Sequence, residues 1–141
     1  MKISKLTVRG FRSMADVTWQ PGSLNILIGP NASGKSNLLR CVEMLSASAR
    51  GELEKYVQRE GGIEPLVWDG SASVIEFLVE LARQDHVAIG NQYSLALKRL
   101  GKRSTYQIGY EYLADFGASS SKWIELHPVM RCFMKGNGKS S

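Results

Sequence analysis

The stretch LNILIGPNASGKS, residues 24–36, decides the predicted fold of this chain. Residues 24–28 are apolar apart from one asparagine, which predicts a central strand covered on both faces. Residues 29–36 match the pattern G-x-x-x-x-G-K-[ST] at every fixed position. With ordinary residue frequencies, a chance match in a chain this long is expected in roughly half a percent of cases. The motif therefore predicts a phosphate-binding P-loop.

The residue types in this motif suit a triphosphate. Gly29 and Gly34 permit backbone torsions that turn successive amide groups inward, and those amides lie at a helix N-terminus, where anions are favoured. Lys35 is predicted to reach the β- and γ-phosphates, and the Ser36 hydroxyl is predicted to bind Mg²⁺. The alternative is a glycine-rich turn that binds no ligand.

The flanking sequence predicts the elements around the loop. Residues 3–9 and 16–20 alternate between apolar and polar and are predicted to form a hairpin. After the motif, apolar residues recur at the spacing of a helix. This pattern predicts a first helix and then a short second helix that ends at Gly61-Gly62. The predicted apolar face of the first helix comprises Leu38, Leu39, Val42, Leu45 and Ala49, and that of the second comprises Leu53, Tyr56 and Val57.

In the second half of the chain, apolar and polar residues again alternate with a period of two residues. Residues 74–81, 92–98 and 106–112 alternate and have short connections, which predicts an antiparallel β-meander, and residues 123–126 are a candidate last strand. The set Tyr106, Ile108, Tyr110 and Tyr112 is predicted to line one face. We interpret this stripe as core packed on the helices, and a base-stacking platform is the alternative.

Size and composition set outer bounds. The 141 residues suit one domain or one lobe. We predict an ATP-binding lobe at 1–134 and a disordered tail at 135–141. Within the lobe, residues 1–60 hold the first strands, the P-loop and the helices, and residues 61–127 hold the meander. No apolar run is long enough to span a membrane, so a cytoplasmic protein is expected. The net charge of +5 permits contact with nucleic acid but does not demonstrate it. Cys41 is expected to pack as a small apolar side chain.

The hydrolytic half of an ATPase site is missing from the sequence. Such sites use a second strand that ends in acidic residues, but no run of four apolar residues followed by two acids occurs here. Glu80 follows three apolar residues, yet the alternation of apolar and polar residues around it places it more naturally on a solvated sheet face. The Asn-Lys-x-Asp guanine-binding motif is also absent, which weakens a GTPase or small-molecule kinase as the third interpretation.

The order of these features resembles a known family. Gly10-Phe11-Arg12-Ser13, the 24–28 strand, the P-loop and the following Asn-Leu-Leu are similar to the N-terminal lobe of ABC-class ATPases of the SMC/RecF type. The similarity extends to AAA-type proteins related to the OLD-family nucleases, through residues 49–53 and 61–66. The resemblance implies an α/β fold: a P-loop NTPase with central strands, a P-loop helix and an antiparallel β-meander.

The resemblance also implies a site and partners. The implied nucleotide-binding residues are Gly29, Pro30, Asn31, Ala32, Ser33, Gly34, Lys35, Ser36 and Asn37, joined by Arg12 and Ser13. Arg12 as a surface charge beside a turn is the other interpretation. ATP and Mg²⁺ are the implied cofactors, a homodimer with ATP sandwiched between two heads is the implied assembly, and DNA is the implied partner.

The resemblance implies ATP hydrolysis once a C-terminal lobe completes the site, in a setting such as DNA repair or phage defence. Walker B acids, the signature motif and the switch histidine, which this family carries in that lobe, are not found in the sequence. An ATP-sensing module without turnover is therefore the alternative function.

Overall fold

The structure is a computed structural model and describes residues 2–30, 34–82, 89–101, 104–115, 122–125 and 132–133. At residues 89 and 115 and in the last two ranges it describes the backbone alone. The tail predicted at 135–141 lies outside the described residues. Within the helices that the structure describes, none has the length and apolar character needed to cross a bilayer.

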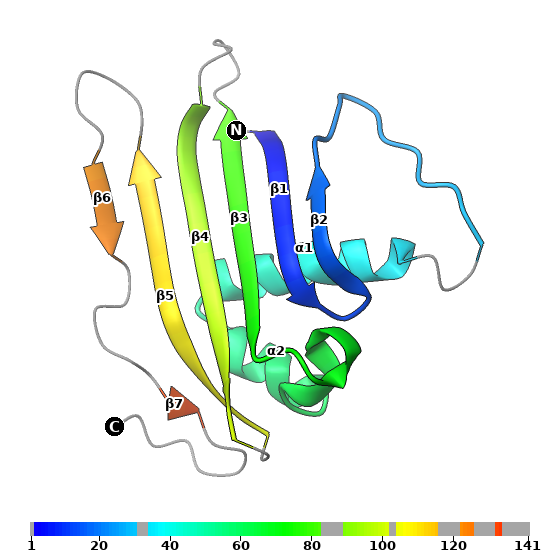
Figure 1. Ribbon diagram of the computed structural model, residues 1–141. Helices are drawn as coiled ribbons and strands as arrows, with labels where there is room; N and C mark the ends of the chain where they lie inside the picture. Colours follow the sequence, from blue (N-terminus) through cyan, green and yellow to red (C-terminus); the bar gives the residue numbers. More distant parts are fainter. Residues whose placement is uncertain are drawn as a thin grey trace.

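One antiparallel sheet forms the body of the molecule (Figure 1). Its spatial order is β2-β1-β3-β4-β5-β6, and β7 also pairs with β5. The predicted hairpin, meander and last strand are all confirmed. The strands are β1 (Lys2–Phe11), β2 (Met14–Trp19), β3 (Val74–Ala82), β4 (Ile89–Leu100), β5 (Thr105–Asp115), β6 (Lys122–Glu125) and β7 (Cys132–Phe133).

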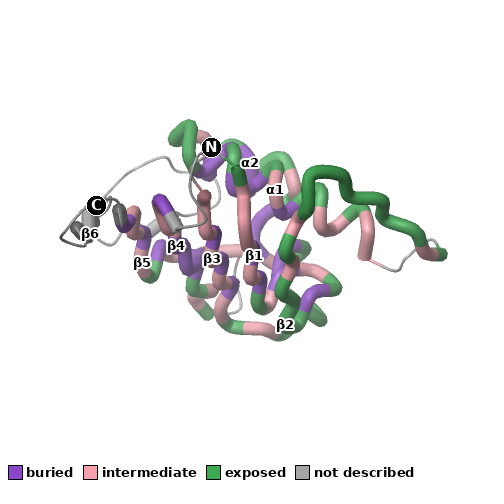
Figure 2. Tube along the Cα trace, turned by 90° about the horizontal axis from the view of Figure 1, so that it is seen from above, coloured by how far each residue is buried: buried purple, intermediate pink, exposed green. Residues whose placement is uncertain are grey.

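Helices α1 (Lys35–Ala49) and α2 (Leu53–Arg59) lie on one side of this sheet (Figures 1 and 2). Both predicted helices are confirmed, and two short 3₁₀ turns, η1 (Glu64–Leu66) and η2 (Trp68–Gly70), lead from α2 to β3. The buried face of α1 is rotated from the predicted one, since Leu39 is 67% exposed. The buried residues of α1 are Cys41, Met44, Leu45, Ala47 and Ser48.

The core lies between the helices and the sheet because the strands alternate. Leu6 and Val8 of β1 are fully or almost fully buried, while the residues between them face the opposite side. The rings of Phe11 and Phe77 pack edge to face, with centroids 5.6 Å apart. Cys41 is completely buried as predicted, and burial raises the pKa of its thiol to about 12, which leaves it unreactive at neutral pH.

The prediction of a central strand at residues 24–28 is wrong. This segment runs away from the sheet after β2 and is in no strand (Figure 1). Ile26 is 72% exposed and Ile28 is 91% exposed, and much of the tube there is coloured as exposed in Figure 2. An apolar run becomes a central strand only when strands flank it on both sides. Among the described residues, no strand pairs with this segment.

The predicted aromatic stripe in β5 is also wrong in part. Tyr106 and Ile108 are buried in the core as predicted. The register then shifts, because Leu97 pairs with Ile108 whereas Ala96 pairs with Tyr110, which leaves Gly109 as an extra residue. This β-bulge reverses the facing of the later residues, so that Tyr110 and Tyr112 stack on each other on the face away from the helices.

We predict that Gly10→Ala destabilises the fold strongly. Gly10 lies within β1 at φ 71°, and a Cβ at this position would overlap the backbone carbonyl of Val74. Gly51→Ala is a matched control, because Gly51 has φ 73° but open space around it. We expect a loss of about 1–2 kcal/mol in the free energy of unfolding for Gly51→Ala from backbone strain alone.

For Gly10→Ala we expect a loss of about 3 kcal/mol or more, because the added methyl group also overlaps backbone. Urea unfolding followed by circular dichroism measures both values. Equal losses in the two variants would contradict the close approach of β1 and β3 at Gly10.

Candidate functional site

The turn between β1 and β2 lies against the start of α1. Phe11 pairs with Met14, so Arg12 and Ser13 form a two-residue turn. The side-chain amide of Asn37, in the first turn of α1, donates a 2.7 Å hydrogen bond to the Ser13 hydroxyl. The structure therefore brings together Arg12, Ser13 and Asn37, three of the residues that sequence resemblance assigned to the site.

Gly34 is the residue from which α1 starts. It is the N-cap at φ 93°, in the left-handed region, and its carbonyl accepts the Leu38 N–H at 3.1 Å. A Cβ at Gly34 would lie only 3.2 Å from the Ser13 hydroxyl oxygen. Glycine is thus required here twice, by the backbone torsion and by the neighbouring turn. The helix begins inside the motif, as the sequence predicts.

Lys35 folds back over the loop. Its ammonium group donates hydrogen bonds to the carbonyl oxygens of Gly29 and Pro30, the second at 3.3 Å. The lysine charge therefore lies between the first residues of the motif and the helix start. The exposed amides at a helix N-terminus also attract anions. The Lys35 ammonium and the N-terminus of α1 therefore both favour an anion at the end of the motif.

Ser36, the predicted Mg²⁺ ligand, is exposed in the first turn of α1. Asn31, Ala32 and Ser33 lie outside the described residues, so the contribution of their amides stays a prediction. In the described part of the chain, no three His, Cys, Asp or Glu side chains group together as a metal site would require. Ser36 alone is the candidate ligand, and Mg²⁺ bound to a nucleotide takes most of its ligands from phosphate and water.

Arg12 lies at the turn in a constrained geometry. Its φ of 48° is in the left-handed region, which is uncommon for a residue other than glycine. Its backbone N–H donates to the Leu66 carbonyl at 2.9 Å, and its guanidinium group forms an ion pair with Glu60. The side chain is only 18% exposed. Arg12 is therefore a half-buried charge with a carboxylate partner rather than a free surface charge, and its approach to a nucleotide stays a prediction.

Sequence reasoning missed Glu60. This residue follows α2 directly, and its side chain is 14% exposed. Its carboxylate meets Arg12, Arg40 at 3.0 Å and Arg59 at 3.7 Å. Glu60 and Arg12 are separated by 48 positions in the sequence, so no local spacing could have indicated the contact.

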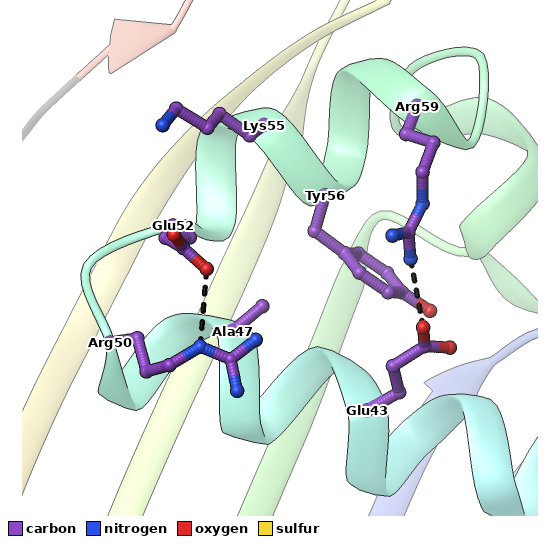
Figure 3. A pocket seen from close by; sticks show the side chains of 7 residues that line it. All are labelled: Glu43, Ala47, Arg50, Glu52, Lys55, Tyr56 and Arg59. Carbon is purple, nitrogen blue, oxygen red and sulfur yellow. Dashed lines mark hydrogen bonds and ion pairs between the residues drawn. The ribbon is translucent and has the colours of Figure 1, made fainter.

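Further charges line a small cavity of about 230 Å³ between α1 and α2, shown in Figure 3. Arg59 pairs with Glu43 at 3.0 Å, and its guanidinium group lies 5.0 Å from the centre of the Tyr56 ring. Arg50 pairs with Glu52 at 3.1 Å. Each of these two arginines has a carboxylate partner, so the cavity is lined by paired charges.

Glu80, the acidic residue that was considered for hydrolysis, lies in β3 opposite Lys5 of β1. Its neighbour Val79 is buried in the core, so the Glu80 side chain points to the face away from the helices. Helix α1, which begins at the end of the P-loop motif, lies on the other face of the sheet (Figure 2). Glu80 is therefore on the solvated sheet face, as predicted, opposite to the face that α1 covers.

Comparison with known proteins gives one family. The model of the AAA ATPase domain family matches residues 1–129. A solved chain from a study of ATP-driven dimerization and DNA-stimulated activation of SMC ATPases is similar in fold, with a TM-score of 0.52 and 22% identity. The similarity covers 77% of this chain and 70% of that one. It supports the predicted α/β, P-loop NTPase fold class.

The curated relatives are longer proteins. The RecF DNA replication and repair protein of Desulforamulus reducens is 33% identical over 58% of this chain and 21% of its own length. RecF of Magnetococcus marinus is 44% identical over 33% of this chain and 12% of its own length. The Smc chromosome partition protein of Thauera aminoaromatica is 32% identical over 52% of this chain and 6% of its own length. The chain thus matches a small part of each of these proteins.

We predict that Ser13 and Asn37 are energetically coupled. Their hydrogen bond joins the β1–β2 turn to α1, and a bond of this kind contributes about 0.5–1.5 kcal/mol. Ser13→Ala, Asn37→Ala and the double variant form a cycle measured by urea unfolding. A coupling energy below about 0.3 kcal/mol, within the range of independent sites, would contradict the contact.

Proposed function

Because this chain belongs to the AAA ATPase domain family, whose model matches residues 1–129, we propose that it binds ATP with Mg²⁺ through the loop at residues 29–36. The observation that carries the proposal is the start of α1. Gly34 caps the helix in the left-handed region, and the Lys35 ammonium lies over Gly29 and Pro30. A cation and a helix N-terminus that converge in this way favour a phosphate group.

Each residue of the loop has a physical task in this proposal. The amides of the loop and of the first turn of α1 donate hydrogen bonds to phosphate oxygens. Lys35 exchanges its carbonyl partners for the β- and γ-phosphates, where its charge is better neutralised. Ser36 offers its hydroxyl to the Mg²⁺ that accompanies the nucleotide. Asn37 holds Ser13, and with it the whole β1–β2 turn, against the site.

Hydrolysis is proposed to need a further lobe. Among the described residues, no three His, Cys, Asp or Glu side chains gather as a metal site would need, and the chain matches about a fifth or less of each curated relative described above. The exposed apolar residues at 24–28 support the same idea, because apolar side chains in such a run usually have a partner. An ATPase in which a C-terminal lobe covers this segment fits these observations.

Two finer proposals follow from the relatives. The name of RecF refers to DNA replication and repair, and the SMC study concerns ATP-driven dimerization and DNA stimulation. We extend both properties to this chain as proposals. Two copies of the chain bind ATP between them, and DNA is the partner. The relation to OLD-family nucleases and a setting in phage defence stay predictions. An ATP-sensing module without turnover is the alternative, and the missing acidic residues favour it for the chain alone.

We predict that Lys35→Ala weakens ATP binding strongly. Loss of a charged hydrogen-bond donor to phosphate is expected to raise the Kd for Mg·ATP about 10- to 100-fold. Isothermal titration calorimetry measures the Kd. Lys55→Ala is the control, since Lys55 is an exposed lysine of α2 beside the cavity in Figure 3 and far from Gly29 in the sequence.

Equal affinity in Lys35→Ala and the unaltered chain would contradict the proposed site. Phosphate release by the same samples separates the two functions. Turnover that disappears in Lys35→Ala supports an ATPase, whereas binding without turnover supports the ATP-sensing module.

We predict that the 24–28 segment binds apolar probes in solution. Ile26→Lys combined with Ile28→Lys should reduce the fluorescence of the dye ANS by roughly half, because two large exposed apolar side chains are removed. Ser23→Lys is the control, since it adds charge to the same segment without removing an apolar group. Unchanged fluorescence in the double variant would show that this segment is covered in solution.

A further inference from the structure

Arg12 adopts a backbone conformation that must be maintained by its surroundings. A φ of 48° costs roughly 1–2 kcal/mol for a residue with a Cβ. Such strain persists only when neighbouring contacts impose it, and it is common at functional positions. The strained residue is in the same turn as Ser13, which touches the start of the P-loop helix.

Two kinds of contact hold Arg12 in place. The Arg12 N–H donates to Leu66, and the adjacent Phe11 forms a bridge with Val67, so the turn is fastened to the segment after α2. The second contact is the ion pair between the Arg12 guanidinium and Glu60. It fixes the direction of the side chain, whereas the backbone contacts fix only the turn.

Glu60 does not neutralise the positive charge around it. Three guanidinium groups surround this one carboxylate, and among the described residues only Arg59 has a second carboxylate partner, Glu43. Within the described residues, the Arg12 Nε is buried and has no hydrogen-bond partner. The region therefore retains a surplus of positive charge beside the turn, which suits an anionic ligand.

We propose that Glu60 is a positioning residue that holds the Arg12 guanidinium at the P-loop, where Arg12 meets the phosphates of a bound nucleotide. The proposal rests on the proposed ATP site and adds a residue to it. Glu60 touches no phosphate itself. It acts through Arg12, whose long side chain would otherwise lose several rotatable bonds of freedom when it binds the nucleotide.

A mutant cycle on ATP affinity tests this role. Glu60→Gln removes the charge and keeps the size, and we expect it to raise the Kd for Mg·ATP about five- to tenfold. Arg12→Ala should have a similar or larger effect. If Glu60 acts through Arg12, the double variant Arg12→Ala/Glu60→Gln binds ATP as Arg12→Ala alone does, because nothing is left for Glu60 to position.

Glu43→Gln is the matched control. Glu43 pairs with Arg59 on the same pair of helices but makes no contact with Arg12, so its variant should bind ATP as the unaltered chain does. Thermal unfolding of every variant checks the fold. Should Glu60→Gln fail to fold, Glu60→Asp keeps the charge at a shorter reach, and the same cycle with Arg12→Ala is measured with it.

The outcomes separate two failures. If the unaltered chain binds no ATP, the proposed function itself is wrong. If it binds ATP but Glu60→Gln leaves the Kd unchanged or lowers it, only the positioning role is wrong, and a lower Kd would mean that Glu60 sequesters Arg12. Additive losses in the double variant would also overturn the proposal, because Glu60 would then act independently of Arg12.

Discussion

The burial of one sheet face under α1 and α2 is the constraint on which the rest of this structure depends. Strands β1 and β3 have their fully buried apolar side chains on one side, so this face has to be covered. Leu6, Phe77 and Met44 belong to that core, and each of them is at most 1% exposed to solvent. With α1 fixed across the sheet, its N-terminus necessarily lies beside the β1–β2 turn, which is where the P-loop residues and Arg12 come together.

The β-bulge at Gly109 adapts the sheet to this packing. Beyond the bulge, Glu111 turns to the helix side and is 4% exposed, where it accepts a 2.6 Å hydrogen bond from the Tyr93 hydroxyl. The Tyr93 oxygen also lies 2.9 Å from the Ser48 hydroxyl of α1. Burial and the carboxylate of Glu111 raise the pKa of Tyr93, so the phenol keeps its proton. The C-terminal half of α1 is thereby tied to the sheet by a polar chain.

Charged side chains make the contacts around the N-terminal half of α1. The Lys35 ammonium contacts carbonyl oxygens of the loop, and the Arg12 guanidinium, which extends from the β1–β2 turn, contacts the Glu60 carboxylate. Glu60 joins the turn to α1 and α2 at once, because its carboxylate contacts one arginine from each. A buried or half-buried carboxylate with several partners costs desolvation energy and is weak support for stability alone. Its contacts instead make it a link between the β1–β2 turn, α1 and α2.

The sequence by itself determined the P-loop motif, the start of α1 at Lys35, both helices and the antiparallel strands. These features depend on local torsions and on periodicity, which neighbouring residues encode. Only the tertiary structure decided the exposure of residues 24–28, the reversal of facing at Gly109 and the contact of Arg12 with Glu60. The first depends on whether partner strands exist, the second on a one-residue shift between paired strands, and the third on the meeting of distant segments. None of these is recorded in the spacing of residues along the chain.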